Sequence, residues 1–235
     1  MFSHLITQHW FPIPENLEET SDNLRIVIDP ALADTVSLST LELTSGQGFI
    51  FMTPEKARLL ELPSEGELDR ESFAQALAGA EIKLNDADNI FYFPEAAQHR
   101  LAAEQSSDTR RLTMADQVEF DKFITHAPVD DVDEAYVELD HWLVYGTFTN
   151  GVLGSVASMY PWVGSKLADL GVITLPKYRG QGLARKTVRA MSAEALRLGY
   201  EPQYRCQLDN TASVALAMAA GFKLFGRWEV IVGEN

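Results

Sequence analysis

The chain has 235 residues, of which 46% are hydrophobic and 23% are charged, with 15 glycines and 10 prolines. These values lie in the ordinary globular range and exclude intrinsic disorder, collagen and low-complexity fibres. The single cysteine, Cys206, excludes an intramolecular disulfide and a cysteine-based zinc cage. The chain start lacks an export signal, and no stretch approaches the roughly 18 apolar residues that span a bilayer. We therefore expect a cytoplasmic protein.

The net charge of −15 argues against a general affinity for nucleic acid or for anionic membranes. The charge is uneven, because residues 1–105 carry −12 and residues 106–235 carry −3. Within the second part, residues 177–205 hold seven basic side chains against two acidic ones. This basic segment is either a solvated helix face or a binding site for an anion.

The first half reads as a mixture of strands and helices. Thr53 and Asp69 are expected helix N-caps, and Pro54 suits the first position of its helix. The expected strands are Asn23–Asp29, Gly48–Met52 and Ile90–Phe93, and the expected helices are Pro54–Leu62, Asp69–Gly79 and Pro94–Glu104. A polar seam at residues 102–108 suggests a boundary between an N-terminal α+β accessory domain, residues 1–105, and a second domain, residues 106–235.

The second half has a clearer order of elements. Asn150-Gly151 is typical of a hairpin turn, and residues 130–138 read as an acidic loop or a short helix. The expected strands are Arg110–Thr113, Trp142–Thr149, Val152–Tyr160, Leu167–Leu175, Gln203–Leu208 and Lys223–Val232, and the expected helices are Asp116–Ile124, Gly182–Leu198 and the segment from Asn210 to Gly221. This order predicts a mixed sheet with helices packed on it, an α+β (mixed α/β) fold.

The strongest local signal is a glycine-rich turn between a strand and a helix, at residues 177–184. Backbone N–H groups at a helix N-terminus have no intrahelical partner and bind anions, and glycines let the backbone approach a phosphate closely. Arg179 could add charge-assisted bonds. The spacing is not that of a P-loop, and Arg185 stands where a dinucleotide fingerprint needs its third glycine.

These residues resemble the GNAT superfamily of acyl-CoA-dependent N-acetyltransferases. Arg179, Gly182 and Ala184 match the family's pyrophosphate loop, Gln/Arg-x-x-Gly-x-Gly/Ala. A second motif, Asn-x-x-Ser/Ala before a helix that ends in Gly-Phe, appears at Asn210, Ser213, Gly221 and Phe222. The resemblance covers residues 106–235 and implies a GNAT-like, largely antiparallel sheet flanked by helices. Residues 1–105 are either a diverged half-copy of the same fold or a separate cap.

The resemblance implies acetyl-CoA as co-substrate and a set of residues that hold it. The strand would splay from its neighbour and offer its backbone to the pantetheine at Val172, Ile173, Thr174 and Leu175. The pyrophosphate would be held by Arg179, Gly180, Gln181, Gly182, Leu183 and Ala184. Arg185, with Lys186 and Arg189, could meet the ribose phosphate. Asn210 would reach the pantetheine arm, or is a plain helix cap.

The implied reaction is attack of a neutral amine on the thioester carbonyl. Family members often carry an acidic residue where Asp169 stands, which makes it the candidate base, with Glu138 and Asp140 as second choices; the alternative is a surface charge. The family's usual tyrosine acid is replaced by Ala217. A thiolate is a fair leaving group, so this loss need not end activity.

Other residues complete the expected site. Tyr160 and Trp162 would line the acceptor site, unless they only pack in the core. The acidic run of Asp130, Asp131, Asp133 and Glu134 would attract cationic amines, or is a solvated loop. The five histidines show no metal-ligand spacing, so no metal is expected. Cys206 is expected to be a buried, inert thiol.

The sequence thus predicts an acetyl-CoA-dependent N-acetyltransferase that acts on a primary amine of a small molecule or a peptide. One alternative is a catalytically weak acyl-CoA-binding sensor or scaffold, suggested by the missing tyrosine and the unmatched first half. Another is a nucleotide-binding protein that uses the glycine turn. The sequence names neither the acceptor nor the oligomeric state.

Overall fold

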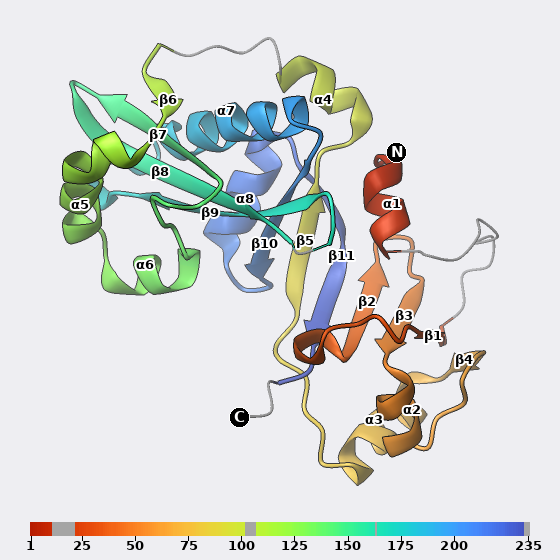
Figure 1. The fold of residues 1–235 in the computed structure, drawn as a ribbon. Coiled ribbons are helices and arrows are strands. Elements are labelled where there is room, and N and C mark those ends of the chain that lie inside the picture. The colour runs from red at the N-terminus through yellow and green to blue at the C-terminus, as the bar shows by residue number, and fades with distance from the viewer. Residues whose placement is uncertain (11–21, 102–106, 163, 233–235) are drawn as a thin grey trace. The chain divides into compact units, whose positions relative to one another are not determined.

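The computed structural model describes residues 1–10, 22–101, 107–162 and 164–232 (Figure 1). The chain forms two compact units that interleave along the sequence. The first is drawn from Met1–Ile13, Phe91–Arg205 and Thr211–Lys223, and the second from Pro14–Ile90, Cys206–Asn210 and Leu224–Asn235. In the described ranges no helix has both the length and the apolar character needed to cross a membrane.

The first unit contains a mixed, largely antiparallel sheet in the strand order β10-β9-β8-β7-β6. Strands β10 and β9 run parallel, and the other neighbours run antiparallel. The strands are β6 (Thr109–Arg111), β7 (Leu143–Thr149), β8 (Val152–Pro161), β9 (Leu167–Thr174) and β10 (Glu201–Gln207). The helices are α1 (His4–Trp10), α4 (Glu95–Leu101), α5 (Gln117–His126), α6 (Val129–Ala135), α7 (Leu183–Arg197) and α8 (Thr211–Ala220). The predicted sheet flanked by helices is confirmed.

Helices cover both faces of this sheet (Figure 1). On one face, the Thr187 hydroxyl of α7 lies 2.6 Å from the Thr147 hydroxyl of β7. On the other face, Val156 and Ile173 share a buried apolar cluster with Phe120 of α5. Strand side chains alternate between faces, so β8 and β9 present different residues to α7 and to the α5–α6 side.

The predicted hairpin turn at Asn150-Gly151 and the glycines that flank α7 adopt the expected backbone conformations. Asn150 and Gly151 both adopt positive φ, 51° and 76°, in the turn between β7 and β8. Gly182 and Gly199, at φ 78° and 79°, flank α7 at its start and end. The acidic stretch at residues 130–138 begins as helix α6 and continues past Tyr136, which has φ 46°.

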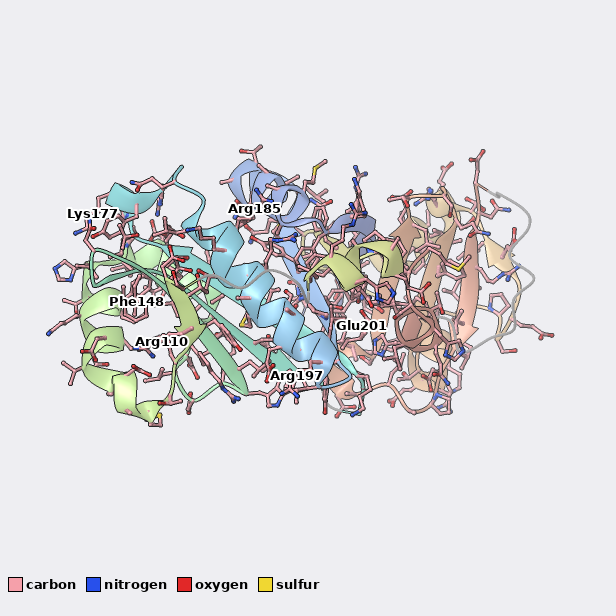
Figure 2. The ribbon with its side chains drawn as sticks, turned by 90° about the horizontal axis from the view of Figure 1, so that it is seen from above. Arg110, Phe148, Lys177, Arg185, Arg197 and Glu201 are labelled. Carbon is pink, nitrogen blue, oxygen red and sulfur yellow. The ribbon has the colours of Figure 1, made fainter. Side chains whose placement is uncertain are left out.

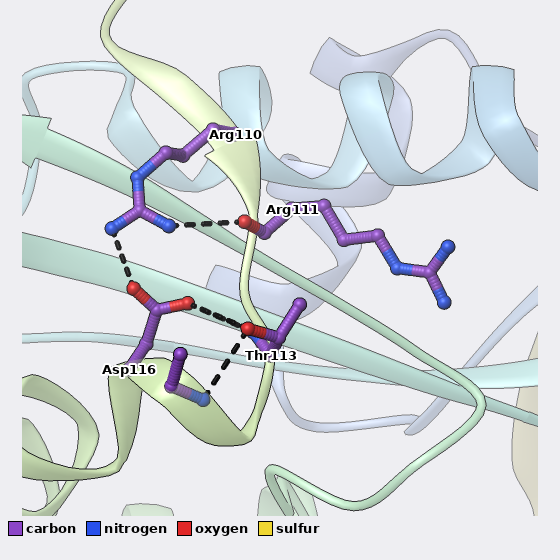
Figure 3. A network of polar contacts seen from close by, with 5 residues as sticks. Arg110, Arg111, Thr113 and Asp116 are labelled. Atoms are coloured by element: carbon purple, nitrogen blue, oxygen red, sulfur yellow. Dashed lines mark hydrogen bonds and ion pairs between the residues drawn. The ribbon is translucent and has the colours of Figure 1, made fainter.

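A capping box precedes α5, in the short 3-10 helix Met114–Asp116 (Figure 3). The Thr113 hydroxyl accepts from the Ala115 N–H at 3.3 Å, and the Asp116 carboxylate accepts from the Thr113 N–H at 2.9 Å. Asp116 also accepts from Arg110 at 2.7 Å, and this ion pair lowers the pKa of Asp116. These bonds satisfy donors that the start of a helix leaves free.

The second unit contains neighbouring strands in the order β4-β1-β3-β2-β11. It consists of β1 (Leu24–Ile28), β2 (Leu38–Leu43), β3 (Gly48–Met52), β4 (Glu67–Leu68) and β11 (Lys223–Val230), with helices α2 (Pro54–Leu59) and α3 (Arg70–Gly79). Strand β11 pairs antiparallel with β2, so strands far apart in the sequence are neighbours in this unit. Strand β5 (Asp88–Tyr92) carries the chain from this unit to the first.

The predicted helix caps of the second unit are present. The Thr53 hydroxyl accepts from the Lys56 N–H at 3.2 Å, and Asp69 accepts from the Ser72 N–H at 2.8 Å. Strand β2 and helix α1 were not among the expected elements. The boundary between residues 105 and 106 stays a prediction, and residues 102–106 of the polar seam lie outside the described residues.

Candidate functional site

The turn before α7 is built to receive an anion. Gly180 and Gly182 adopt left-handed φ values of 73° and 78°, and open space surrounds the position of a Cβ at each. The Lys186 N–H donates to the Gly182 carbonyl at 3.2 Å, which starts the helical ladder. The amides of the preceding turn, Leu183 to Arg185, therefore have no acceptor within the helix. No side chain caps this end and no acidic residue lies in its first turn, which leaves the amides and the dipole open to a ligand.

The cations around this turn are partly engaged within the protein. The Arg179 Nε donates to the Thr174 carbonyl at 3.2 Å, and the same guanidinium pairs with Asp131 of α6. Lys186 pairs with Asp108 at 2.8 Å. Arg185 is exposed near the start of α7, far along the helix from Arg197 (Figure 2). The acidic segment thus supplies a counter-ion to the loop arginine, a contact that the sequence analysis did not anticipate.

Strand β9 leaves β10 shortly before this turn. The two strands pair from Leu167 to Leu170, whereas β8 stays paired with β9 as far as Thr174. Ile173 and Leu175 bury their side chains in the core, so only their backbone groups could contact a ligand. This is the predicted splay. The four predicted pantetheine positions, Val172 to Leu175, lie along it and lead directly into the glycine turn.

The candidate base, Asp169, is buried, with only 4% of its surface exposed, which excludes the alternative of a surface charge. Its Oδ2 accepts from Nη2 and Nε of Arg205, at 2.6 and 2.9 Å, and from the Tyr160 hydroxyl at 3.4 Å. Its Oδ1 accepts from the Gln203 amide at 3.2 Å. The role of Asp169 as a base stays a prediction, and its carboxylate is the centre of a buried network.

The network continues to the N-terminal helix of the same unit. Gln203 Oε1 accepts from the Tyr92 hydroxyl, which in turn accepts from the Trp10 indole N–H at 2.9 Å. Burial raises the pKa of Tyr92 well above 10, so its hydroxyl remains a donor. No local motif marks Trp10, Tyr92, Gln203 and Arg205 in the sequence, because they come from separate segments.

Tyr160 and Trp162, the predicted acceptor residues, lie in two ring clusters joined by the Asp169–Arg205 pair. The Trp162 ring lies 6.1 Å from the Trp10 ring, and the Arg205 guanidinium lies 5.6 Å from its centroid. The Tyr160 ring lies 5.1 Å from that of His141. Burial and the nearby Asp169 raise the pKa of Tyr160. Both residues thus border the buried pair, and their contact with the acceptor stays a prediction.

The remaining predicted residues are placed as follows. Asn210 directly precedes α8, in the short segment of the second unit, and its contact with pantetheine stays a prediction. Ala217 is fully buried in α8. Cys206 is buried, as expected, and burial raises the pKa of its thiol to about 11, so little thiolate exists at neutral pH. Across the described part of the chain, no three His, Cys, Asp or Glu side chains are grouped to hold a metal ion.

Comparisons with known proteins concern the family and the fold of this chain. The profile of the GNAT acetyltransferase family matches residues 102–231. The N-acetyltransferase YdfB of Bacillus subtilis, itself uncharacterised, is 34% identical over 74 residues. That match covers 32% of this chain and only 28% of the relative. A GNAT-family acetyltransferase structure from Colwellia psychrerythraea shares the fold with a TM-score of 0.52 and 16% identity, over 77% of this chain and 75% of the other.

The fold is therefore shared with a GNAT-family acetyltransferase. Because the family profile spans more than half of the sequence, the chain belongs to the GNAT acetyltransferase family.

Proposed function

We propose that the protein transfers an acetyl group from acetyl-CoA to a primary amine, of a small molecule or a peptide, in the cytoplasm. One observation carries this proposal. Strand β9 parts from β10 after Leu170, and the short 3-10 helix Pro176–Tyr178 and the glycine turn connect it to the N-terminus of α7, whose first amides no side chain caps in the described residues. An extended strand edge suits the amides of a pantetheine arm, and the turn that follows suits its diphosphate.

Different residues would bind the different parts of acetyl-CoA. The backbone of residues 172–175 would bond the pantetheine, and the turn from Arg179 to Ala184 would bond the diphosphate. Arg185, exposed near the start of α7, would meet the ribose phosphate. Arg179 would exchange its bond to Asp131 for the diphosphate, because a doubly charged ligand offers it more negative charge than one carboxylate.

In the reaction, the amine nitrogen forms a bond to the thioester carbonyl carbon, the carbon–sulfur bond breaks, and coenzyme A leaves as a thiolate. The nitrogen must lose a proton. Asp169 is buried and accepts from Arg205 and Gln203, and the Tyr160 hydroxyl also donates to its Oδ2 at 3.4 Å. We assign the proton's path to the Tyr160 hydroxyl and then to Asp169.

The alternative, an acyl-CoA-binding sensor or scaffold, is favoured by one observation. Ala217 is buried within α8, so no hydroxyl at that position can protonate the leaving thiolate. Such a protein would bind acetyl-CoA without turning it over.

Thermal unfolding measured by calorimetry, with and without acetyl-CoA, tests the cofactor site. Acetyl-CoA at about 100 times its dissociation constant should stabilise the protein by roughly 2.7 kcal/mol. Gly182→Asp should abolish this gain, because it places a negative charge against the diphosphate. Gly199→Asp is the matched control, since Gly199 has the same left-handed φ at the other end of α7. The site assignment fails if Gly182→Asp folds and still gains stability, or if ATP or NAD stabilises better than acetyl-CoA.

A further inference from the structure

A group of side chains lies on the sheet face opposite α7, beside the point where β9 leaves β10. Gly171 is the first residue past the paired stretch, and its register partner on β8 is Ser158. The Ser158 Oγ accepts from the Glu138 N–H at 3.3 Å and lies 2.8 Å from Nδ1 of His141. These two bonds fix the segment that carries Glu138 and His141 next to the splay.

Glu138 carries a negative charge that its surroundings do not neutralise. In the described structure its ion-pair contact is with His141 Nε2, at 3.6 Å. Burial lowers the pKa of His141 below 6.5, so the imidazole is uncharged at neutral pH. The neighbouring carboxylates are engaged elsewhere, Asp131 with Arg179 and Asp169 with Arg205. The Glu138 side chain is 51% exposed and can therefore meet a ligand.

The imidazole that faces this carboxylate, His141, contacts two tyrosine rings. The centroid of the His141 ring lies 5.0 Å from that of Tyr136 and 5.1 Å from that of Tyr160. The two tyrosine rings lie 5.7 Å apart, and the three contacts are tilted or edge-on. Tyr136 is 54% exposed despite its size, and its left-handed backbone, φ 46°, ends α6. Exposed aromatic surface beside a carboxylate suits an organic cation, which the ring faces attract and the carboxylate binds.

We propose that Glu138 binds the ammonium group of the acceptor and that the exposed ring of Tyr136, with the partly buried ring of Tyr160, receives its apolar part. This inference rests on the proposed function and names its substrate class: primary amines next to an aromatic or apolar group and without a carboxylate. A zwitterionic amino acid would bring its own carboxylate toward Glu138 and Asp140 and is disfavoured. His141 is a positioning residue, because it is held by Ser158 and faces Glu138.

Steady-state kinetics with two matched amines test the proposal. The wild-type protein should acetylate 2-phenylethylamine with a kcat/KM at least about tenfold above that for phenylalanine. Glu138→Gln should lower kcat/KM for 2-phenylethylamine about tenfold or more, through the KM of the amine, because it removes a charge-assisted contact. The KM for acetyl-CoA should stay unchanged. Glu119→Gln, which removes an exposed carboxylate of α5 that has no part in the proposed site, is the control and should change either value less than about twofold.

The positioning role of His141 has its own readout. His141→Gln keeps a donor toward Glu138 and should retain most of the amine preference. His141→Phe fills the ring volume without hydrogen bonds and should raise the KM of the amine about as much as Glu138→Gln. If both variants lose the preference equally, or neither does, His141 does not position Glu138.

The outcomes separate this proposal from the proposed function. If the wild type acetylates amines and Glu138→Gln behaves like it, the ammonium site is wrong and the transferase stands. If no amine is acetylated, the transferase fails. Binding of 2-phenylethylamine, followed by tryptophan fluorescence, then decides: weaker binding by Glu138→Gln supports the site, and equal binding overturns it.

Discussion

The loop before α7 and the face that carries Asp169 are built in different ways. The loop offers backbone amides and a helix dipole from one short segment, with glycines at left-handed φ. The opposite face offers side chains from α1, the segment after α6, and strands β8, β9 and β10. In the proposed function, the first would recognise any ligand with a suitably placed diphosphate, whereas the second would select one amine among many. Cofactor binding and acceptor turnover should therefore fail separately when each region is altered.

Asp169→Asn should show the largest effect, confined to the acceptor face. Removing the proton acceptor should lower the turnover rate at neutral pH by about 10²–10⁴-fold. Breaking the buried pair with Arg205 should also lower the free energy of unfolding, by up to about 3–5 kcal/mol. Acetyl-CoA affinity, measured by titration at a temperature where the variant is folded, should stay nearly intact. An unchanged pH–rate profile would leave Asp169 a structural residue and move the search to Glu138, Asp140 or water.

Gly171→Ala tests the place where the two regions meet. A Cβ there would lie 1.7 Å from the Ala135 carbonyl, so α6 would have to move. We expect a loss of about 1–3 kcal/mol in unfolding free energy, together with weaker acetyl-CoA binding and slower turnover. Gly79→Ala, in α3 where a Cβ meets open space, is the control and should not destabilise. Wild-type behaviour of Gly171→Ala would show that α6 does not pack on β9 in this way.

Asp131→Asn should have a smaller effect, confined to the cofactor side. Its carboxylate pairs with Arg179, and both groups are partly exposed, so the pair contributes at most about 1 kcal/mol. Freeing Arg179 should tighten acetyl-CoA binding up to about fivefold and leave the amine KM unchanged. Weaker acetyl-CoA binding would mean that Asp131 orients Arg179 for the ligand and does not compete with it.

The contrast also explains what the sequence could reveal. The glycine turn is contiguous, so its residues, φ requirements and neighbouring strand and helix could be predicted together. The helices after Thr53 and Asp69 could be predicted for the same reason, because an N-cap residue directly precedes the helix that it caps. The network of Trp10, Tyr92 and Arg205 could not be predicted, because its members lie up to 195 residues apart and are joined only by folding. The pairing of β11 with β2 could not be predicted from the sequence either, since the register between distant strands depends on tertiary packing.

The central claim is that acetyl-CoA is consumed as an amine is acetylated. The most direct measurement incubates the protein with acetyl-CoA and 2-phenylethylamine, and follows free thiol and N-acetylated amine together. We predict that the two appear in equal amounts, catalytically, and that Gly182→Asp abolishes both while Gly199→Asp does not. Tight binding of acetyl-CoA with no amide product from this amine or from a broad panel of amines would contradict the claim, and would identify the chain as an acyl-CoA-binding protein.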